Sequence, residues 1–451
     1  MTTMEYGFIS CLPIIVLMVG AMLTKRITEM LALAAFTGAI LLYKGDFMRG
    51  FVEVLYETFS SWSLQFVFII LFSFGGLIKL FQTSGAISGF GNILNKYASG
   101  PKKPLVLAWI LGILMFVDDF LNTLTVCFSL RELTDRNGIP REHLSMQAAI
   151  LAASMASLVP FSSWAGFHIG LISDEGLAFM DYAKAIPFMF FPIIGVICCL
   201  LVDVNIIKKH GALKAAYDRV AQGGSPIPHD EGESAMLQMD MEEDVAPSSA
   251  WNVIVPLVAM VAGTFIFDFD LTYGCIISII VQMAMYMAQR LMSPKKFVDD
   301  FLDGAKSMFP LMVLVTFAFT LSNVNGKLGF FEYMIAKIGA VVPGTLLPAM
   351  AFLLVALATF ATAGYWSMQV ISVPIFLPLA AALGVNPSII VAAIMSGVSF
   401  GCCYCFYSDN IIMTAAGSEV STLRQIKTST TYVVPCAVLS FICYLIAGFI
   451  F

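Results

Sequence analysis

Two adjacent carboxylates interrupt an apolar stretch in the first half of the chain. Residues 116–125 read FVDDFLNTLT, and the segment before them, Leu105–Val117, carries no charge. An ionisable group inside a bilayer costs roughly 2.5–3.5 kcal/mol on insertion scales, so Asp118 and Asp119 are expected to serve a function. Neighbouring helix positions point in different directions. We therefore expect one aspartate to face a cavity, and a helix cap is the alternative role for the other.

Neutral oxygen donors follow these carboxylates closely. Asn122, Thr123 and Thr125 supply an amide and two hydroxyl groups. A hard cation such as Na⁺ takes several oxygen ligands, and carboxylate, amide, hydroxyl and freed backbone carbonyl groups fit that preference. We predict a Na⁺ site made by Asp118, Asn122, Thr125 and Asp409, the last of which comes from the second half of the chain.

Similar polar clusters occur at three further places. The predicted cation- or substrate-binding residues in them are Ser162, Ser163, Trp164, Thr362, Tyr365, Trp366, Ser408, Asp409 and Asn410. A bare cation does not need the aromatic members, whereas an organic substrate could use them, and packing is the alternative role. His168 is either a proton relay or a satisfied polar residue near a helix end. The sequence CCYC at 402–405 lacks the paired CxxC or nearby His of a zinc site.

Composition assigns the chain to the polytopic all-α membrane proteins. Of 451 residues, 59% are hydrophobic and 12% charged, and the mean hydropathy is +0.88. Apolar runs of about the length of a membrane span cover Phe8–Leu23, Met30–Tyr43, Trp62–Phe81, Ala183–Ile207, Val253–Phe267, Gly274–Ala288 and Thr431–Phe451. The net charge of −6 lies mostly in one loop and indicates no nucleic-acid partner. No catalytic motif stands in a suitable context, so we predict neither an enzyme nor a cofactor, only Na⁺ as coupling ion.

A charged segment divides the chain into two halves that resemble each other. We predict a first transmembrane repeat at 1–207, an acidic, flexible, cytoplasmic linker at 208–249 and a second, inverted repeat at 250–451. FVEVLYETF at 51 matches FVDDFLDGA at 297, and three further matches follow in the same order at an offset of about 246 residues. Such internal repetition is typical of transporters.

The polar interruptions fall at matched positions in the two halves. DDFLNT (118–123) and ATAGYWS (361–367) lie midway through long apolar stretches, and VPFSSWAGF (159–167) and CYCFYSDN (403–410) interrupt further helices. The first stretch has basic residues on both sides, which predicts a re-entrant hairpin with DDFLNT at its tip. We expect each repeat to contain one re-entrant hairpin and one broken helix, with about ten full crossings in all. Non-helical backbone at membrane depth must line a cavity or be buried in protein, so the four breaks should converge near the midplane.

The stretch from VDDFLNTLTV to VPFSSW resembles the NhaC-type Na⁺/H⁺ antiporter family of the ion-transporter superfamily. Residues at the positions of that family's motifs are Asp118, Asp119, Asn122, Leu124, Thr125, Thr134, Asp135, Arg136, Arg141, Glu142, Leu144, Pro160, Ser162, Ser163 and Trp164. The similarity runs over nearly the whole chain. It implies inverted repeats, re-entrant hairpins, Na⁺ coupling and a location in the bacterial inner membrane.

Two departures from the family pattern keep a second function open. Ala149 and Cys402 stand where the family carries acids, and Cys403 stands where it carries a histidine. The resemblance favours Na⁺/H⁺ exchange, whereas the missing acids and the added aromatics favour Na⁺-coupled symport of a small organic solute, such as an amino acid or carboxylate. A channel is disfavoured because broken-helix repeats suit alternating access. The expected partners are the lipid bilayer, Na⁺, and H⁺ or the solute; a homodimer, the solute and the stoichiometry are left open.

Overall fold

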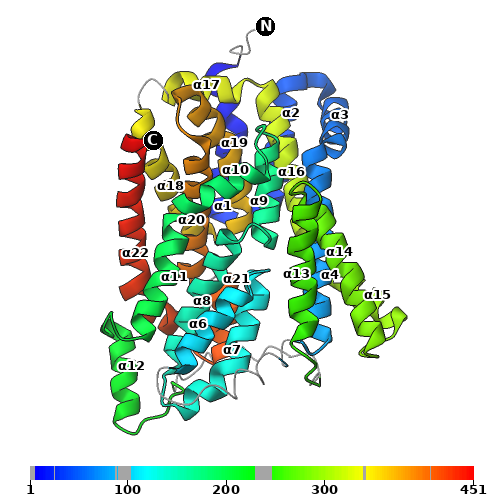
Figure 1. Ribbon diagram of the computed structural model, residues 1–451. Coiled ribbons are helices and arrows are strands. Elements are labelled where there is room, and N and C mark those ends of the chain that lie inside the picture. Colours follow the sequence, from blue (N-terminus) through cyan, green and yellow to red (C-terminus); the bar gives the residue numbers. More distant parts are fainter. Residues whose placement is uncertain are drawn as a thin grey trace.

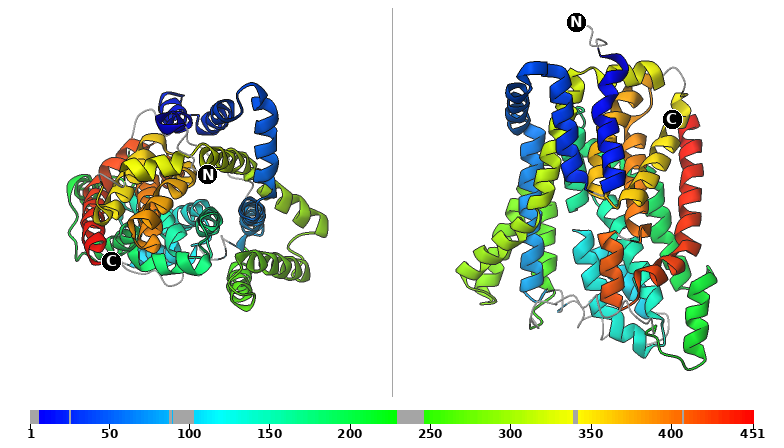
Figure 2. Two further views of the ribbon diagram at one scale, coloured as in Figure 1. Left: turned by 90° about the horizontal axis from the view of Figure 1, so that it is seen from above. Right: turned by 180° about the vertical axis from the view of Figure 1, so that it is seen from behind.

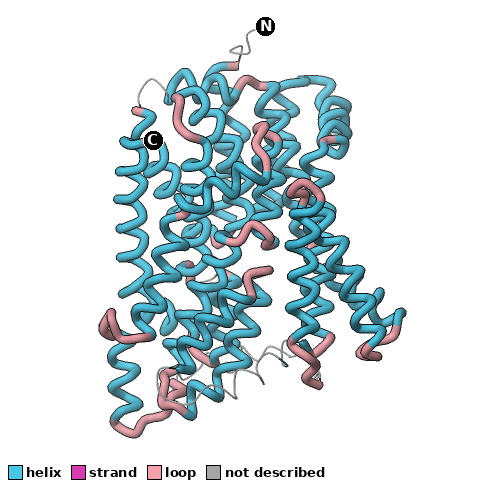
Figure 3. Tube along the Cα trace, viewed as in Figure 1, coloured by secondary structure: helices cyan, strands magenta, loops and turns pink. Residues whose placement is uncertain are grey.

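The chain is helical throughout the part that the structure describes. The computed structural model describes residues 6–24, 26–86, 89, 103–228, 246–338, 342–406 and 408–451. Within these ranges the regular elements are all helices, and loops lie inside the molecule as well as at its two ends (Figure 3). Eight of the described helices are long and apolar enough to cross a membrane, or up to ten if each of two bent pairs forms one span. The prediction of a polytopic all-α membrane protein is confirmed.

The helices follow the chain in two series, one from each half. Those of the first half are η1 (Gly7–Cys11), α1 (Leu12–Thr24), α2 (Ile27–Tyr43), η2 (Lys44–Asp46), α3 (Phe47–Ser60), α4 (Trp62–Thr83), α6 (Lys103–Leu114), α7 (Asp119–Arg136), α8 (Arg141–Leu158), α9 (Ser163–Ser173), α10 (Phe179–Ala185), η3 (Ile186–Phe188), α11 (Phe190–Asp203) and α12 (Gly211–Ala221). Those of the second half are α13 (Trp251–Ile266), α14 (Leu271–Ala288), α15 (Pro294–Ser307), α16 (Phe309–Lys327), α17 (Phe330–Ile338), η4 (Gly344–Leu346), α18 (Leu347–Thr362), α19 (Tyr365–Leu383), α20 (Pro387–Tyr404), α21 (Asp409–Ser418) and α22 (Thr422–Ile450).

The predicted hairpins and broken helices recur in both halves. The helices α8 and α20 begin at Arg141 and Pro387 and end at Leu158 and Tyr404, so both their starts and their ends are 246 residues apart. Each is followed by a break and a short helix, α9 or α21. The hairpin α6–α7 lies in the lower half of the molecule and α18–α19 in the upper half (Figure 1). The two hairpins therefore enter from opposite ends, as an inverted repeat requires.

Seen from above, the helices form a dense group and a flanking group (Figure 2). The dense group contains α6–α12 and α18–α22, and α1–α4 with α13–α16 lie beside it. At its centre are α8 and α20, nearly all of whose residues are buried. Close approach explains the small residues of α20: a Cβ added at Gly401 would lie 2.4 Å from Thr359 of α18, and one at Gly397 would lie 2.9 Å from the backbone of Ala356.

The apolar run Ala183–Ile207 is bent where we expected one span. The segments Phe179–Phe188 and Phe190–Asp203 meet at an angle of 52°. Pro192 has no N–H with which to bond the carbonyl of Phe188, four residues earlier. The hydroxyl of Tyr444 in α22 donates to that carbonyl instead, at 2.8 Å. The bend is thus stabilised by a residue from the other half of the chain.

The predicted linker contains an ordered helix at its start. The segment Gly211–Ala221 forms α12, which buries Leu213 and Ala216. Packing of this apolar face against α22 explains why this part is helical, although its sequence is more polar than that of the spans. The acidic residues 229–245, for which we predicted flexible loop, lie outside the described residues.

Candidate functional site

Asp118 caps the helix that follows the tip of the first hairpin. Its Oδ1 accepts hydrogen bonds from the backbone N–H groups of Phe120 and Leu121, at 3.0 and 3.4 Å. Its Oδ2 accepts a further hydrogen bond from Ser163 Oγ at 2.7 Å. Both oxygens of Asp118 therefore hold the hairpin tip in place, one against the start of α7 and the other against the start of α9.

Asp119 has one carboxylate oxygen that is free to bind something else. Its Oδ1 accepts a hydrogen bond from Trp164 Nε1 at 3.0 Å. Its Oδ2 is buried and has no hydrogen-bond partner among the described residues. Asn122, on the next turn of α7, donates from Nδ2 to the carbonyl of Gly112 at 2.6 Å, and its buried Oδ1 likewise lacks a partner in the described ranges. We call Asp119 Oδ2 and Asn122 Oδ1 the open oxygens; buried acceptors of this kind are suited to a cation or a proton.

The second half joins its own hairpin to its own broken helix in the same way. Tyr365, the first residue of α19, donates from its hydroxyl to Asp409 Oδ2 at 2.9 Å. The other carboxylate oxygen of Asp409 accepts the N–H of Asn410 at 2.8 Å. In each half, therefore, one hydrogen bond from an aromatic side chain to a carboxylate joins two helix starts. One is the start of the hairpin's second helix, and the other is the start of the second segment of the broken helix.

Two serines make the same cap at the two broken helices. Ser162 Oγ donates to the carbonyl of Ala156 at 2.5 Å and accepts the N–H of Ala165. Ser408 Oγ donates to the carbonyl of Cys402 at 2.7 Å and likewise accepts an N–H three residues later. The carbonyl lies six residues before the serine in both cases. Each hydroxyl thus satisfies one carbonyl and one N–H that the break would leave unpaired.

The two half-sites meet through an aromatic stack. The rings of Trp164 and Tyr365 lie 4.8 Å apart and nearly parallel, so the indole bonded to Asp119 rests on the phenol bonded to Asp409. Both rings are buried. Asp118 is the chain neighbour of Asp119 and bonds Ser163, which precedes Trp164. Three acidic side chains from the two halves of the chain, Asp118, Asp119 and Asp409, are therefore brought into one region.

Thr123 and Asn410 add polar contacts across the same interface. Thr123 Oγ1 donates to Asn410 Oδ1 at 3.2 Å. Asn410 Nδ2 donates to the carbonyl of Ala149 at 3.1 Å. The backbone carbonyl of Ala149 therefore positions Asn410, and its side chain offers no titratable group.

Three other predicted residues have structural partners. The hydroxyl of Thr125 donates to the carbonyl of Leu121 at 2.6 Å. Thr362 Oγ1 donates to the carbonyl of Ala358, one turn earlier, and accepts the N–H of Gly364. These bonds close the tip of the second hairpin. Trp366 is half-buried and its ring lies 5.8 Å from that of Trp164.

Among the described residues, no group of three or more His, Cys, Asp and Glu side chains is placed to hold a metal ion. A cation at the open oxygens would therefore be held by carboxylate and neutral oxygens together, as Na⁺ allows.

A buried polar pair that the sequence did not predict lies beside the aromatic stack. Gln369 of α19 and His168 of α9 are buried, and Gln369 Oε1 lies 3.1 Å from His168 Nδ1. Gln369 lies 246 residues after Thr123, so the repeat offset could have identified it.

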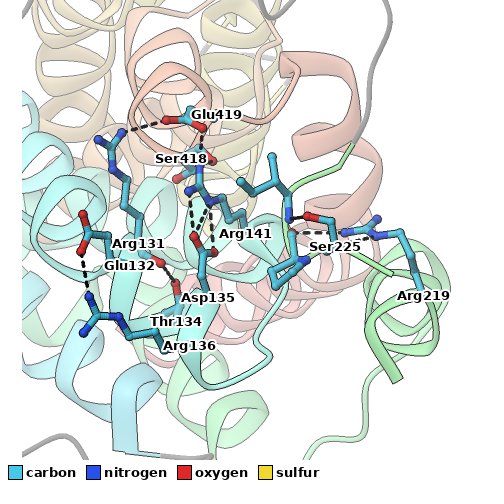
Figure 4. Close-up of polar contacts among 12 residues, drawn as sticks. Arg131, Glu132, Thr134, Asp135, Arg136, Arg141, Arg219, Ser225, Ser418 and Glu419 are labelled. Atoms are coloured by element: carbon cyan, nitrogen blue, oxygen red, sulfur yellow. Dashed lines mark hydrogen bonds and ion pairs between the residues drawn. The ribbon is translucent and has the colours of Figure 1, made fainter. Parts of the chain in front are cut away.

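Arg141, the first residue of α8, links the ends of α7 and α21 through ion pairs. Its guanidinium bonds Asp135 at the end of α7 at 2.7 Å and Glu419 just after α21 (Figure 4). Glu419 also pairs with Arg131 at 3.1 Å. Arg141 is only 5% exposed. The first hairpin, the central helix α8 and the broken helix of the second half are thus held at one end by a shared ion-pair network.

Replacing Arg141 with leucine is expected to lower the free energy of unfolding by about 2 kcal/mol, because two partly exposed carboxylates lose charged hydrogen bonds from a buried guanidinium. Arg136→Leu is the matched control, since Arg136 pairs with Glu132 on an exposed surface and should change stability by less than about 1 kcal/mol. Thermal unfolding of both purified variants in detergent measures the difference. Equal midpoints for the two variants would contradict a stabilising role for the network.

Comparisons with known proteins agree with this architecture. A family model described as the Na⁺/H⁺ antiporter family matches residues 155–449. An uncharacterised protein of Haemophilus influenzae is 24% identical over 98% of this chain and 91% of its own length. The Alcanivorax borkumensis YdaH transporter is similar in structure, with a TM-score of 0.67 and 13% identity over 94% of this chain and 97% of that one. Neisseria gonorrhoeae MtrF, described among a class of antimetabolite efflux pumps, has a TM-score of 0.50 and 13% identity over 90% and 85% of the two chains.

Proposed function

This chain belongs to the Na⁺/H⁺ antiporter family, and we propose that it exchanges Na⁺ for H⁺ across the bacterial inner membrane, with Asp119 as the residue that binds either ion. The open oxygen Asp119 Oδ2 is the observation that carries this proposal. A buried ionised carboxylate requires compensation by a cation or a proton. One oxygen that binds Na⁺ or H⁺, but not both together, couples the two ions by competition.

Neighbouring groups fit the two states of Asp119. With Na⁺ bound, the carboxylate is ionised, Trp164 Nε1–H stabilises Oδ1, and Asn122 Oδ1, on the next turn of α7, supplies a second ligand. With a proton bound, Asp119 is neutral and no cation is required. We place Na⁺ at Asp119 and Asn122, in preference to Asp118 and Thr125. The oxygens of Asp118 already accept hydrogen bonds from the start of α7 and from Ser163, and the hydroxyl of Thr125 donates to the carbonyl of Leu121.

The aromatic residues have a use that does not require an organic solute. Trp164 and Tyr365 each donate to a carboxylate and stack on each other in the interior. These bonds support exchange, because they give two of the added aromatic side chains a role beside the carboxylates. MtrF, which shares the fold, is described as an antimetabolite efflux pump, so an organic solute is the alternative that the experiment must separate.

The purified protein in proteoliposomes with an internal pH dye provides the test. An imposed Na⁺ gradient, with voltage clamped by K⁺ and valinomycin and no organic solute present, should drive a pH change that empty liposomes lack. The reversed gradient should reverse the sign of the change. A protein that binds Na⁺ but gives no pH change would contradict exchange and direct the search to amino acids and small carboxylates.

A further inference from the structure

His168 holds a nitrogen that nothing in the described chain bonds. The ring is fully buried, and its Nε2 has no hydrogen-bond partner among the described residues. Its other nitrogen, Nδ1, lies 3.1 Å from Gln369 Oε1. Because the amide nitrogen of Gln369 donates to the carbonyl of Tyr365 at 3.4 Å, its oxygen faces the histidine. An amide oxygen can only accept, so the proton of neutral His168 lies on Nδ1 and Nε2 carries a lone pair.

The pair lies one helical turn beyond the aromatic stack. His168 follows Trp164 by four residues on α9, and Gln369 follows Tyr365 by four residues on α19. These two helices are in contact along this stretch, in the upper half of Figure 1. A residue four positions along a helix lies on the same face one turn away. The His168–Gln369 pair is therefore the next layer after the rings that hold Asp119 and Asp409.

A pocket begins on the far side of that layer. Leu171 of α9 and Val370 of α19 line it, together with Asp174 and Glu175 in the turn after α9 and with Ser322 of α16. It is a partly open hollow of about 270 Å³, a volume that includes the space at its mouth. Burial, together with the charge of Asp174, raises the pKa of Glu175 to about 7. Glu175 can therefore take up and release protons near neutral pH.

We propose that His168 is a proton-relay residue that carries protons between this acidic pocket and Asp119. A proton from the pocket adds to Nε2 and gives an imidazolium, whose Nδ1–H remains bonded to Gln369 Oε1. The same proton then leaves Nε2 and reaches the carboxylate of Asp119 by way of water, since the Trp164 indole lies between the two side chains. This restores the neutral imidazole and neutralises the carboxylate. Release of a proton follows the same steps in reverse. The relay rests on the proposed Na⁺/H⁺ exchange.

The other groups around His168 do not replace it in this role. The ring of Tyr182 on α10 lies 5.9 Å away, but its hydroxyl donates to the carbonyl of Ser157 at 2.6 Å. Asp174 and Glu175 face the pocket, beyond the buried layer, and Asp119 lies on the opposite side, behind Trp164. His168 is therefore the titratable side chain in the layer between them, within the part of the chain that the structure describes.

His168→Asn tests the relay, because an asparagine amide reproduces the donor at Nδ1 and lacks the acceptor at Nε2. In proteoliposomes we expect the Na⁺-driven pH change to slow by about 100-fold, the lower range for losing a proton-transfer group. Exchange of ²²Na⁺ for unlabelled Na⁺ at equal pH needs no proton transfer and should persist at the wild-type rate. His210→Asn, at the start of α12 and away from the site, is the matched control and should leave both rates unchanged.

Each outcome separates the relay from the exchange. A wild-type pH change in His168→Asn would overturn the relay, and so would equal loss of both rates, since that indicates a packing role. If the wild type itself exchanged ²²Na⁺ without any pH change, the proposed exchange would fail and the relay with it. Selective loss of the pH change supports both.

Discussion

Replacing Asp119 with asparagine is expected to abolish the Na⁺-driven pH change, whereas Asp118→Asn should leave most of it. The two residues are adjacent, yet only Asp119 has an open oxygen. Asparagine at 119 can neither bind a proton at pH 7 nor offer Na⁺ a full negative charge. Asparagine at 118 remains a good helix cap, because its side-chain oxygen can still accept the N–H groups at the start of α7. The measurement is the internal pH of proteoliposomes under an imposed Na⁺ gradient.

Asp303→Asn on α15 is the matched control for both variants. This carboxylate is exposed and pairs with Lys306 at 2.8 Å on the same helix, so its loss should not alter exchange. Size-exclusion chromatography would verify that every variant is folded. Wild-type exchange by Asp119→Asn would remove Asp119 from the mechanism, and a loss confined to Asp118→Asn would transfer the role to its neighbour.

Replacing Trp164 with phenylalanine should raise the Na⁺ concentration for half-maximal exchange by about 10- to 100-fold. A hydrogen bond to a charged group contributes about 1.5–3 kcal/mol, and 1.4 kcal/mol corresponds to a factor of ten. Phenylalanine keeps an aromatic ring beside Tyr365 but loses the N–H that donates to Asp119 Oδ1. Because Asp119 is ionised only while Na⁺ is bound, losing that donor weakens the binding of Na⁺ and not the binding of a proton.

Trp366→Phe provides the comparison for this variant. Trp366 contacts the same aromatic cluster, at 4.8 Å from the ring of Phe167, but Trp164 is the tryptophan that donates to the carboxylate. We expect the Na⁺ dependence of Trp366→Phe to remain close to that of the wild type. Equal shifts in both variants would mean that the cluster acts through packing, and the role assigned to the indole N–H would be withdrawn.

The positions of the breaks could be predicted from sequence because they rest on local chemistry. A carboxylate or hydroxyl within an apolar helix needs partners, and the freed backbone groups need caps. DDFLNT and ATAGYWS therefore mark hairpin tips, and the serines at 162 and 408 mark the restarts of α9 and α21. The common offset of 246 residues then relates each tip to its counterpart.

Which aspartate is open could not be predicted, because that depends on contacts between distant segments. Each aspartate has one distant partner, 45 residues along the chain: Ser163 for Asp118 and Trp164 for Asp119. Asp118 also uses its second oxygen to cap α7, and Asp119 does not. The partners of Arg141 are similarly distant, since Glu419 lies 278 residues away. No local pattern indicates such pairs, and the repeat offset relates equivalent positions, not residues in contact.

The bend at Met189 was missed for a related reason. Hydropathy treats Ala183–Ile207 as one apolar run, and proline inside a membrane helix is tolerated where other groups satisfy the freed carbonyl. Here that group is the hydroxyl of Tyr444, 256 residues away.

The matched bonds between hairpin and broken helix also bear on how the protein is made. Asp118 with Ser163, Asp119 with Trp164, and Tyr365 with Asp409 are separated by 44 or 45 residues and never cross between the halves. The first pair of bonds can therefore form while the ribosome is still synthesising the second half, since chains fold progressively from the N-terminus. The contacts that do cross, such as Thr123 with Asn410, span 287 residues and must come last. The bonds that join each hairpin to its own broken helix can thus form before the two halves meet, and the contacts between the halves, such as the Trp164–Tyr365 stack, form when the halves dock.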